Sequence, residues 1–187
     1  KTVTCGEGGV FITNDDYAFE LANSLHGQGQ SKKKRYVHER LAYNYRMTNV
    51  TAAFLYGQLV NLDKILDEKD RIFSLYRNLL SEVPEISFQK INNSTKHSNW
   101  IFGVRTKLNY HNKVQNELLS HGIETRPMFY PMSSHKHLEN IARKNKENNA
   151  SILSDECFML PSYPELSDKN IEKIVSSLKN LVTKGNK

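Results

Sequence analysis

The sequence predicts an α/β protein in which helices alternate with short strands, and three observations indicate this fold class. A glycine cluster separates two short extended runs within residues 1–13. Apolar residues then recur at helical spacing over residues 49–80, which is typical of a long amphipathic helix. From residue 83 onward, short apolar runs alternate with helical patterns, as in a compact α+β unit.

The first residues predict a β-hairpin. Val3 and Thr4 precede a Gly-Glu-Gly-Gly turn at residues 6–9, and an apolar run follows at residues 10–13. Glycine adopts the positive φ angles of tight turns without steric cost. On composition alone, Lys1 would be an ordinary surface lysine in front of this hairpin.

A helix is predicted over residues 17–25, with Asp15 or Asp16 as its N-cap. After a glycine-containing loop, residues 32–35 form the run Lys-Lys-Lys-Arg. Such a run is usually a solvated loop, but it also suits the diphosphate of a nucleotide-linked substrate. Nucleic-acid binding is less favoured, because no aromatic platform is interleaved with these charges.

The remaining chain predicts one long helix and a smaller α+β unit. Thr48 caps the helix over residues 49–80, and Pro84 lies just beyond its end. The predicted elements that follow are strands at 86–90 and 100–104, a helix at 109–121 ended by Gly122, an extended segment at 123–126 before Pro127, a helix at 146–156, a strand at 157–160, and a helix at 168–183 capped by Ser167, with a tail at 184–187.

Composition is that of a globular protein of 187 residues, with 38% hydrophobic and 25% charged residues. We expect neither a membrane span nor a signal peptide, because no apolar run approaches the roughly 20 residues that a bilayer requires. Cys5 and Cys157 are far apart and stand in no metal-ligand spacing. Two unpaired cysteines favour a reducing cytoplasmic location.

The net charge and the histidines give little further information about ligands. The net charge of +6 permits attraction to phosphate-bearing ligands without demonstrating it. His135 and His137 lack a cysteine or carboxylate frame, so no metal site is predicted.

The first fifteen residues read KTVTCGEGGVFITND. This segment resembles the signature of the DegT/DnrJ/StrS nucleotide-sugar aminotransferases. In that family the lysine at this point holds pyridoxal 5'-phosphate covalently. The resemblance implies that Lys1 is both the cofactor-binding and the catalytic lysine. Relatives that dehydrate sugars carry histidine there, so a lysine implies transamination.

A second match covers residues 41–48, which read LAYNYRMT. It resembles the G-Y-N-Y-R-M segment of the same family, with Ala42 in place of the usual glycine. In the family this asparagine reaches across a dimer interface to the cofactor phosphate of the other subunit. The resemblance therefore implies cofactor binding by Asn44 and a homodimer with shared active sites. Without it, Asn44 would be a loop residue before a helix.

Further matches point to the perosamine synthase branch of the family. Residues 122–131 read GIETRPMFYP, residues 160–164 read LPSYP, and residues 27–29 read GQG. The resemblance implies substrate contacts by Arg126 and Tyr130, and more weakly by Arg46 and Arg35. A structural ion pair is the alternative for Arg126, which stands on rigid backbone before a proline.

The resemblance implies a fold and a division of the chain. The fold is the C-terminal half of a fold-type I aminotransferase. Residues 1–47 would end the large cofactor-binding domain, residues 48–82 would form a linking helix, and residues 83–187 would form the small α+β domain. We expect the chain to be part of a longer protein, because the family's ring-binding aspartate precedes the lysine.

The implied reaction is transamination of a nucleotide-linked 4-keto-6-deoxy sugar to a 4-amino-4,6-dideoxy sugar of the GDP-perosamine type, with L-glutamate as amino donor. One alternative keeps the chemistry with a UDP- or dTDP-linked ketosugar of the viosamine type. A second is a regulatory relative that binds a sugar nucleotide and catalyses nothing.

Overall fold

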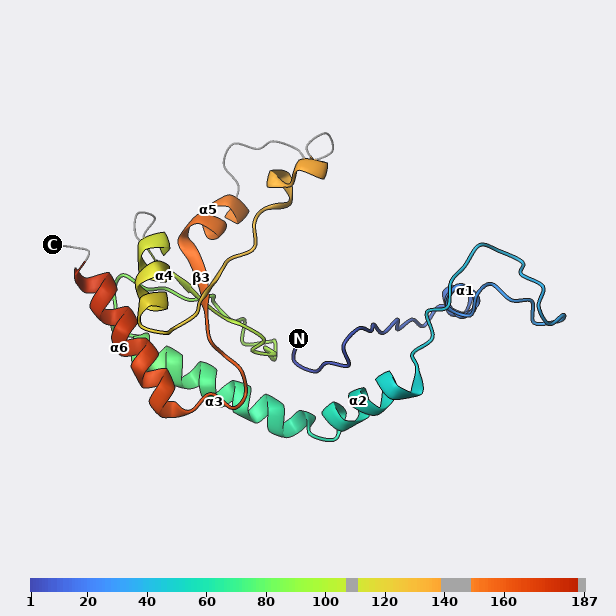
Figure 1. Cartoon of the computed structure of the whole chain (residues 1–187), viewed down its shortest axis with the longest axis horizontal. Coiled ribbons are helices and arrows are strands. Elements are labelled where there is room, and N and C mark those ends of the chain that lie inside the picture. The colour runs from blue at the N-terminus through green and yellow to red at the C-terminus, as the bar shows by residue number, and fades with distance from the viewer. Residues whose placement is uncertain (107–110, 139–148, 185–187) are drawn as a thin grey trace. The chain divides into compact units, whose positions relative to one another are not determined.

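The computed structural model describes residues 1–106, 111–138 and 149–184. The chain forms two compact units. The first unit comprises Lys1 and Val3–Leu62, and the second comprises Thr2 and Asp63–Lys187. Figure 1 shows the elements of each. The predicted division at residues 47 and 82 remains a prediction.

The first unit contains two capped helices, α1 (Asp16–His26) and α2 (Asn49–Leu59). The Asp15 carboxylate accepts a hydrogen bond from Ala18 N at 3.0 Å, which caps α1 as predicted. The Thr48 hydroxyl accepts from Thr51 N at 3.2 Å and caps α2. Both side chains satisfy amide groups that have no partner within the helix.

The predicted N-terminal hairpin is wrong for this structure, because residues 1–15 contain no strand. The apolar side chains of its second arm are largely exposed, at 81% for Val10 and 86% for Ile12. A two-stranded hairpin is marginal in water unless one face is buried. The glycine turn alone therefore does not create a strand pair.

The predicted continuous helix over residues 49–80 is also wrong, since two helices occupy it. α2 ends at Leu59, and α3 (Leu62–Leu80) starts after Val60 and Asn61. The Asn61 side-chain amide donates to Gly57 O at 2.8 Å, and its backbone amide donates to Gln58 O at 3.2 Å. These bonds satisfy carbonyls at the end of α2 and close its last turn. The spacing of apolar residues does not reveal this end of α2, because polar hydrogen bonds form it.

The second unit is built on a three-stranded antiparallel sheet of order β1-β3-β2. Its strands are β1 (Phe102–Arg105), β2 (Arg126–Pro127) and β3 (Cys157–Leu160). β3 has the predicted bounds. The strand predicted at 86–90 is reduced to one bridge between Ser87 and Arg105.

Three longer helices and a short one complete the second unit: α3, α4 (His111–Ser120), α5 (Asn149–Glu156) and α6 (Asp168–Lys184). Two short 3₁₀ turns, Met132–Ser134 and Lys136–Leu138, follow β2. The predicted starts of the helices at 109 and 146, and the end of the tail predicted at 184–187, lie outside the described residues. Ser167 Oγ accepts from Asn170 N at 3.3 Å, as predicted for the cap of α6.

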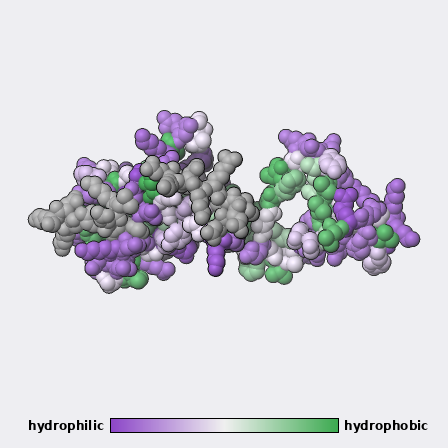
Figure 2. Space-filling view, turned by 90° about the horizontal axis from the view of Figure 1, so that it is seen from above, coloured by the Kyte–Doolittle hydropathy of each residue, from purple (hydrophilic) through white to green (hydrophobic). Residues whose placement is uncertain are grey.

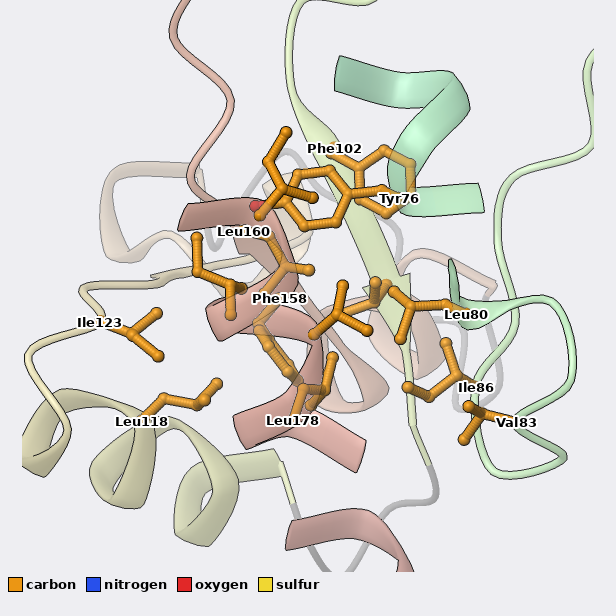
Figure 3. Packing of buried hydrophobic residues seen from close by; sticks show 14 of the residues in the cluster. Tyr76, Leu80, Val83, Ile86, Phe102, Leu118, Ile123, Phe158, Leu160 and Leu178 are labelled. Carbon is orange, nitrogen blue, oxygen red and sulfur yellow. The ribbon is translucent and has the colours of Figure 1, made fainter. Parts of the chain in front are cut away.

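The hydrophobic core lies between one face of the sheet and the helices α3, α4 and α6 (Figure 3). Alternate strand residues point into it, because successive side chains of a strand face opposite sides. Phe102 stacks on Tyr76 with ring centroids 4.7 Å apart, and Phe73 meets Phe102 edge-on at 5.0 Å. Leu118, Leu178 and other core residues are fully buried.

The first unit buries no comparable cluster. Neither α1 nor α2 contains a buried residue. Large apolar side chains are exposed along it, and Figure 2 shows hydrophobic residues on its surface in green. Among the described helices of the whole chain, none combines the length and apolar character needed to cross a membrane.

Candidate active site

Lys1 opens a segment that passes beside the region of Asn44 within the first unit. Lys1 is exposed. A Cβ placed on Gly8 would lie 2.9 Å from Cys5 Sγ and 3.2 Å from Met47 Cε. The glycine turn after Lys1 thus packs against Met47, three residues from Asn44, and any larger residue at Gly8 would displace these side chains.

The segment containing Asn44 is held by backbone pairing to the end of α1. Gly27 and Asn44 form an antiparallel bridge. Gln28 N donates to Tyr43 O at 3.0 Å, and Tyr45 N donates to His26 O at 3.1 Å. The Tyr43 and Tyr45 rings stack at 5.4 Å. These contacts fix the backbone and leave the Asn44 side chain exposed.

Gly29 makes the neighbouring turn possible. Its φ of +63° lies in the left-handed region, and a Cβ there would lie 2.3 Å from Arg40 O. Only glycine fits this close backbone approach. The turn carries the Gly-Gln-Gly motif and leads into the basic run.

The basic run at residues 32–35 is exposed and partly paired within the first unit. Lys32 forms an ion pair with Glu20. The Arg35 guanidinium lies over the Tyr36 ring, 4.8 Å from its centroid. Arg46 is exposed on the Asn44 segment. Four of the six predicted site residues, Lys1, Arg35, Asn44 and Arg46, thus belong to this unit.

Arg126 and Tyr130 belong to the second unit. Arg126 begins β2 and lies opposite Met159 of β3, and its side chain is exposed. Tyr130 lines a pocket beside the sheet together with Met159. Arg126 is not among the described residues that line this pocket. Arg126 takes part in none of the salt bridges between described residues.

Sequence reasoning missed how α3 holds the loops of the second unit. Lys69 is only 5% exposed, and its ammonium donates to Trp100 O at 2.7 Å and to Ser162 O. Burial lowers the pKa of Lys69. Tyr76 donates to Pro161 O at 2.9 Å. Two of these three hydrogen bonds are accepted by the backbone carbonyls of Pro161 and of Ser162 beside it, and the third by the carbonyl of Trp100, so no side-chain pattern in the sequence indicates them.

Neither histidines nor cysteines assemble a metal site in the described parts of the chain. The His135 and His137 rings lie 5.8 Å apart without further ligands of that kind. Cys157 is buried, and burial raises the pKa of its thiol.

Comparison with models of protein families shows which family the chain belongs to. Residues 1–179 match the model described as the DegT/DnrJ/EryC1/StrS aminotransferase family. The chain belongs to this family. The match covers the Lys1 segment, the Asn44 segment and nearly all of the second unit.

Curated members of the family include proteins named GDP-perosamine synthase. The one from Vibrio cholerae is 35% identical over 183 residues, covering 96% of this chain and 50% of the relative. The one from Escherichia coli O157:H7 is 31% identical, covering 95% and 48%. A Campylobacter jejuni protein named UDP-4-amino-4,6-dideoxy-N-acetyl-beta-L-altrosamine transaminase is 22% identical, covering 98% and 50%. The chain spans about half the length of these relatives.

Solved structures share the fold at lower identity. A DegT/DnrJ/EryC1/StrS aminotransferase from Brucella abortus has a TM-score of 0.81 at 19% identity, covering 91% of this chain and 45% of that one. Helicobacter pylori PseC, described as an aminotransferase of pseudoaminic acid biosynthesis, has a TM-score of 0.83 at 15% identity, covering 92% and 48%. These likenesses confirm the predicted fold class, the C-terminal half of a fold-type I aminotransferase.

The donor set of the first unit fits the cofactor of this aminotransferase family. A primary amine at Lys1 suits the aldehyde of pyridoxal phosphate, and the Asn44 amide suits its phosphate. Both side chains are exposed rather than engaged in a core. The Asn44 Oδ1 accepts a hydrogen bond from Arg46 N at 3.4 Å.

Proposed function

We propose that this chain is part of a pyridoxal phosphate-dependent aminotransferase that converts a GDP-linked 4-keto-6-deoxy sugar into the 4-amino-4,6-dideoxy sugar. L-Glutamate is the amino donor. The observation that carries the proposal is the Lys1 segment packed beside Met47 on the Asn44 segment. Family membership over residues 1–179 supports the same conclusion.

Lys1 and Asn44 have different roles in the proposed reaction. When bound, pyridoxal phosphate supplies an aldehyde for amine exchange and a ring that accepts electrons. Lys1 Nζ would hold the cofactor as a primary amine and, when free, would move the proton at the reacting carbon of the substrate. The Asn44 side-chain amide would bind the cofactor phosphate of the other subunit. These roles follow from the family resemblance and the accessible positions of both side chains.

Cationic side chains are suited to the diphosphate of the substrate. Arg35 and Arg46 present guanidinium groups on the first unit, and Arg126 presents one on the second. Guanidinium groups bind phosphate in a bidentate geometry. Tyr130 adds a hydroxyl donor next to Arg126's strand. We assign these four residues to the substrate.

Sequence identity to named relatives favours a GDP-linked substrate over a UDP-linked one. Two relatives named for GDP-perosamine are 35% and 31% identical to this chain, against 22% for the relative named for a UDP sugar. A regulatory role without catalysis is disfavoured, because a binding protein has no use for an accessible lysine at this point of the motif.

We also propose a homodimer with shared active sites, acting in the cytoplasm. The first unit exposes 81% of Val10, 65% of Phe11 and 67% of Phe54. Apolar side chains exposed over a large area are typical of surfaces that another polypeptide covers. A partner subunit that receives Asn44 would cover part of this surface.

The test is the absorbance spectrum of the protein at its natural polypeptide length with pyridoxal phosphate, before and after L-glutamate. We expect a visible band of the lysine-bound cofactor that glutamate converts to the band of the amine form. Lys1→Ala should abolish the first band, while Lys34→Ala, a control in the basic run, should keep it. GDP- and UDP-linked ketosugars then identify the substrate by recovery of the first band.

The proposal fails if no band forms, or if the Lys1→Ala protein shows the same band as the unchanged protein. A band that glutamate does not convert would favour the regulatory alternative.

A further inference from the structure

The second unit contains a pocket of about 870 Å³ on the face of the sheet opposite the core. Strand residues that point away from the core, among them Gly103 and Met159, line it. Residues 128–132 after β2 and side chains of α5 form other walls. Its volume lies in the range of roughly 300–1,000 Å³ that is typical of small-molecule sites.

Gly103 provides space at the floor of the pocket. It pairs with Met159 across the sheet, and a Cβ at Gly103 would lie 3.2 Å from Met128 Cε. A side chain at this position would press against Met128 and occupy space at the floor of the pocket.

Aromatic rings form one side of the pocket. Trp100 and Phe129 are nearly parallel, with centroids 6.1 Å apart and planes at 21°. Although they line a pocket, Trp100 is 37% exposed, Phe129 63% and Tyr130 62%. Exposed flat rings of this kind are surfaces on which another planar ring stacks.

Helix α3 holds this wall in place through consecutive residues. Lys69 donates to the Trp100 carbonyl at 2.7 Å. Asp70 accepts from the side-chain amide of Asn99, whose carbonyl oxygen lies 2.7 Å from His97 Nδ1. His97 lines the pocket. The aromatic wall and a hydrogen-bonding histidine are therefore positioned before any ligand arrives.

The charge of the lining selects the kind of ligand. None of the described residues that line the pocket is acidic, and Arg105 contributes a cation. Arg105 donates to Glu156, and this bond raises the pKa of its guanidinium. Gln89, Ser87 and Ser98 supply neutral polar groups. Such a lining accommodates a planar ring with polar edges.

We propose that this pocket binds the nucleobase of a nucleotide sugar, with the base against Trp100 and Phe129. The proposal rests on the proposed function for the nucleotide-linked nature of the ligand, and it assigns the second unit a part in substrate recognition. Stacking of a base on an aromatic side chain contributes about 1–3 kcal/mol in nucleic-acid binders.

Trp100 is the chain's single tryptophan, so its emission reports directly on the pocket. GDP, UDP and ribose 5-phosphate are titrated into the 187-residue chain, with emission corrected for absorbance by the bases. We expect a saturable change with GDP, a weaker one with UDP and none with ribose 5-phosphate. No response to GDP, or an equal response to ribose 5-phosphate, overturns the proposal.

Two variants locate the binding. Gly103→Val should weaken GDP binding, measured by calorimetry, at least tenfold, whereas Gly57→Val on α2 should leave it unchanged, because a Cβ at Gly57 meets nothing within 4 Å. Should Gly103→Val unfold the second unit, Phe129→Leu provides the same test by removing one exposed ring. Unchanged binding in the folded pocket variant overturns the proposal.

The two proposals fail separately. A cofactor band without GDP binding would retain the aminotransferase and reject the pocket as the base site. GDP binding without a cofactor band would retain the pocket in a protein that binds nucleotides without transamination.

Discussion

The two cysteines differ in environment, and this difference is a property of single residues. Cys157 on β3 is 5% exposed, whereas Cys5 is partly exposed beside the glycine turn. Burial is the main cause that raises the pKa of Cys157, and neighbouring Arg105 opposes it. A higher pKa leaves less thiolate at a given pH, and the thiolate is the reactive form.

We therefore expect iodoacetamide at mildly alkaline pH to modify Cys5 roughly tenfold faster than Cys157, or more, in the folded chain. Peptide mapping by mass spectrometry at timed intervals measures both rates. In concentrated urea the rates should converge, because unfolding removes the burial of Cys157. Equal rates in the native chain would contradict the assigned burial.

Two adjacent leucines of α4 lie on different faces of the helix, one buried and one exposed. Leu118 is fully buried against the core, while Leu119 is 61% exposed. Because one turn contains 3.6 residues, neighbouring side chains on a helix point about 100° apart. The same substitution at the two positions therefore compares a core site with a surface site.

Leu118→Ala should lower the free energy of unfolding of the second unit by about 2–5 kcal/mol, through lost burial and a remaining cavity. Leu119→Ala should change it by no more than about 0.5 kcal/mol. Urea denaturation followed by far-UV circular dichroism and Trp100 emission measures both. Similar losses in the two variants would show that α4 is rotated from the described orientation.

The whole molecule consists of two units of unequal packing. Tyr76, Phe102 and Phe158 lie at the centre of a shared core in the second unit, whereas the helices of the first unit contain no buried residue. Local opening costs little free energy where few apolar contacts exist.

For the 187-residue chain alone, we expect amide hydrogens of α1 and α2 to exchange at least about a hundredfold faster than those of α3 and α6. Hydrogen exchange followed by mass spectrometry resolves these helices. In the proposed homodimer, a partner subunit that covers the exposed apolar residues should slow exchange in α1 and α2. Equal protection of both units in the isolated chain would contradict the described packing.

Short stretches of sequence are sufficient to predict several caps, one strand and the family of the chain. Caps at Asp15, Thr48 and Ser167 rest on side chains that bond to amides within three residues. Apolar residues 157–160 have the bounds of β3. The motifs around Lys1 and Asn44 indicate the family, because each is contiguous in sequence. Their assigned roles, like those of Arg35, Arg46, Arg126 and Tyr130, remain predictions.

Other features depend on partners far away in the chain. Whether residues 1–13 pair as strands depends on a surface that covers them, so glycine spacing led to a wrong hairpin. The Asn61 bonds that end α2 leave no trace in hydrophobic periodicity.

The nucleobase pocket depends on Gly103 lying opposite Met159 and beside Met128. A lysine on an amphipathic helix is usually exposed, but Lys69 is buried. Its ammonium group donates hydrogen bonds to the carbonyls of Trp100 and Ser162, which replace the hydrogen bonds to water. Contiguous residues are sufficient to specify caps, helical periods and motifs, since their interactions span only a few residues. Burial and strand register follow from contacts between distant segments, so only the folded chain decides which side chains meet.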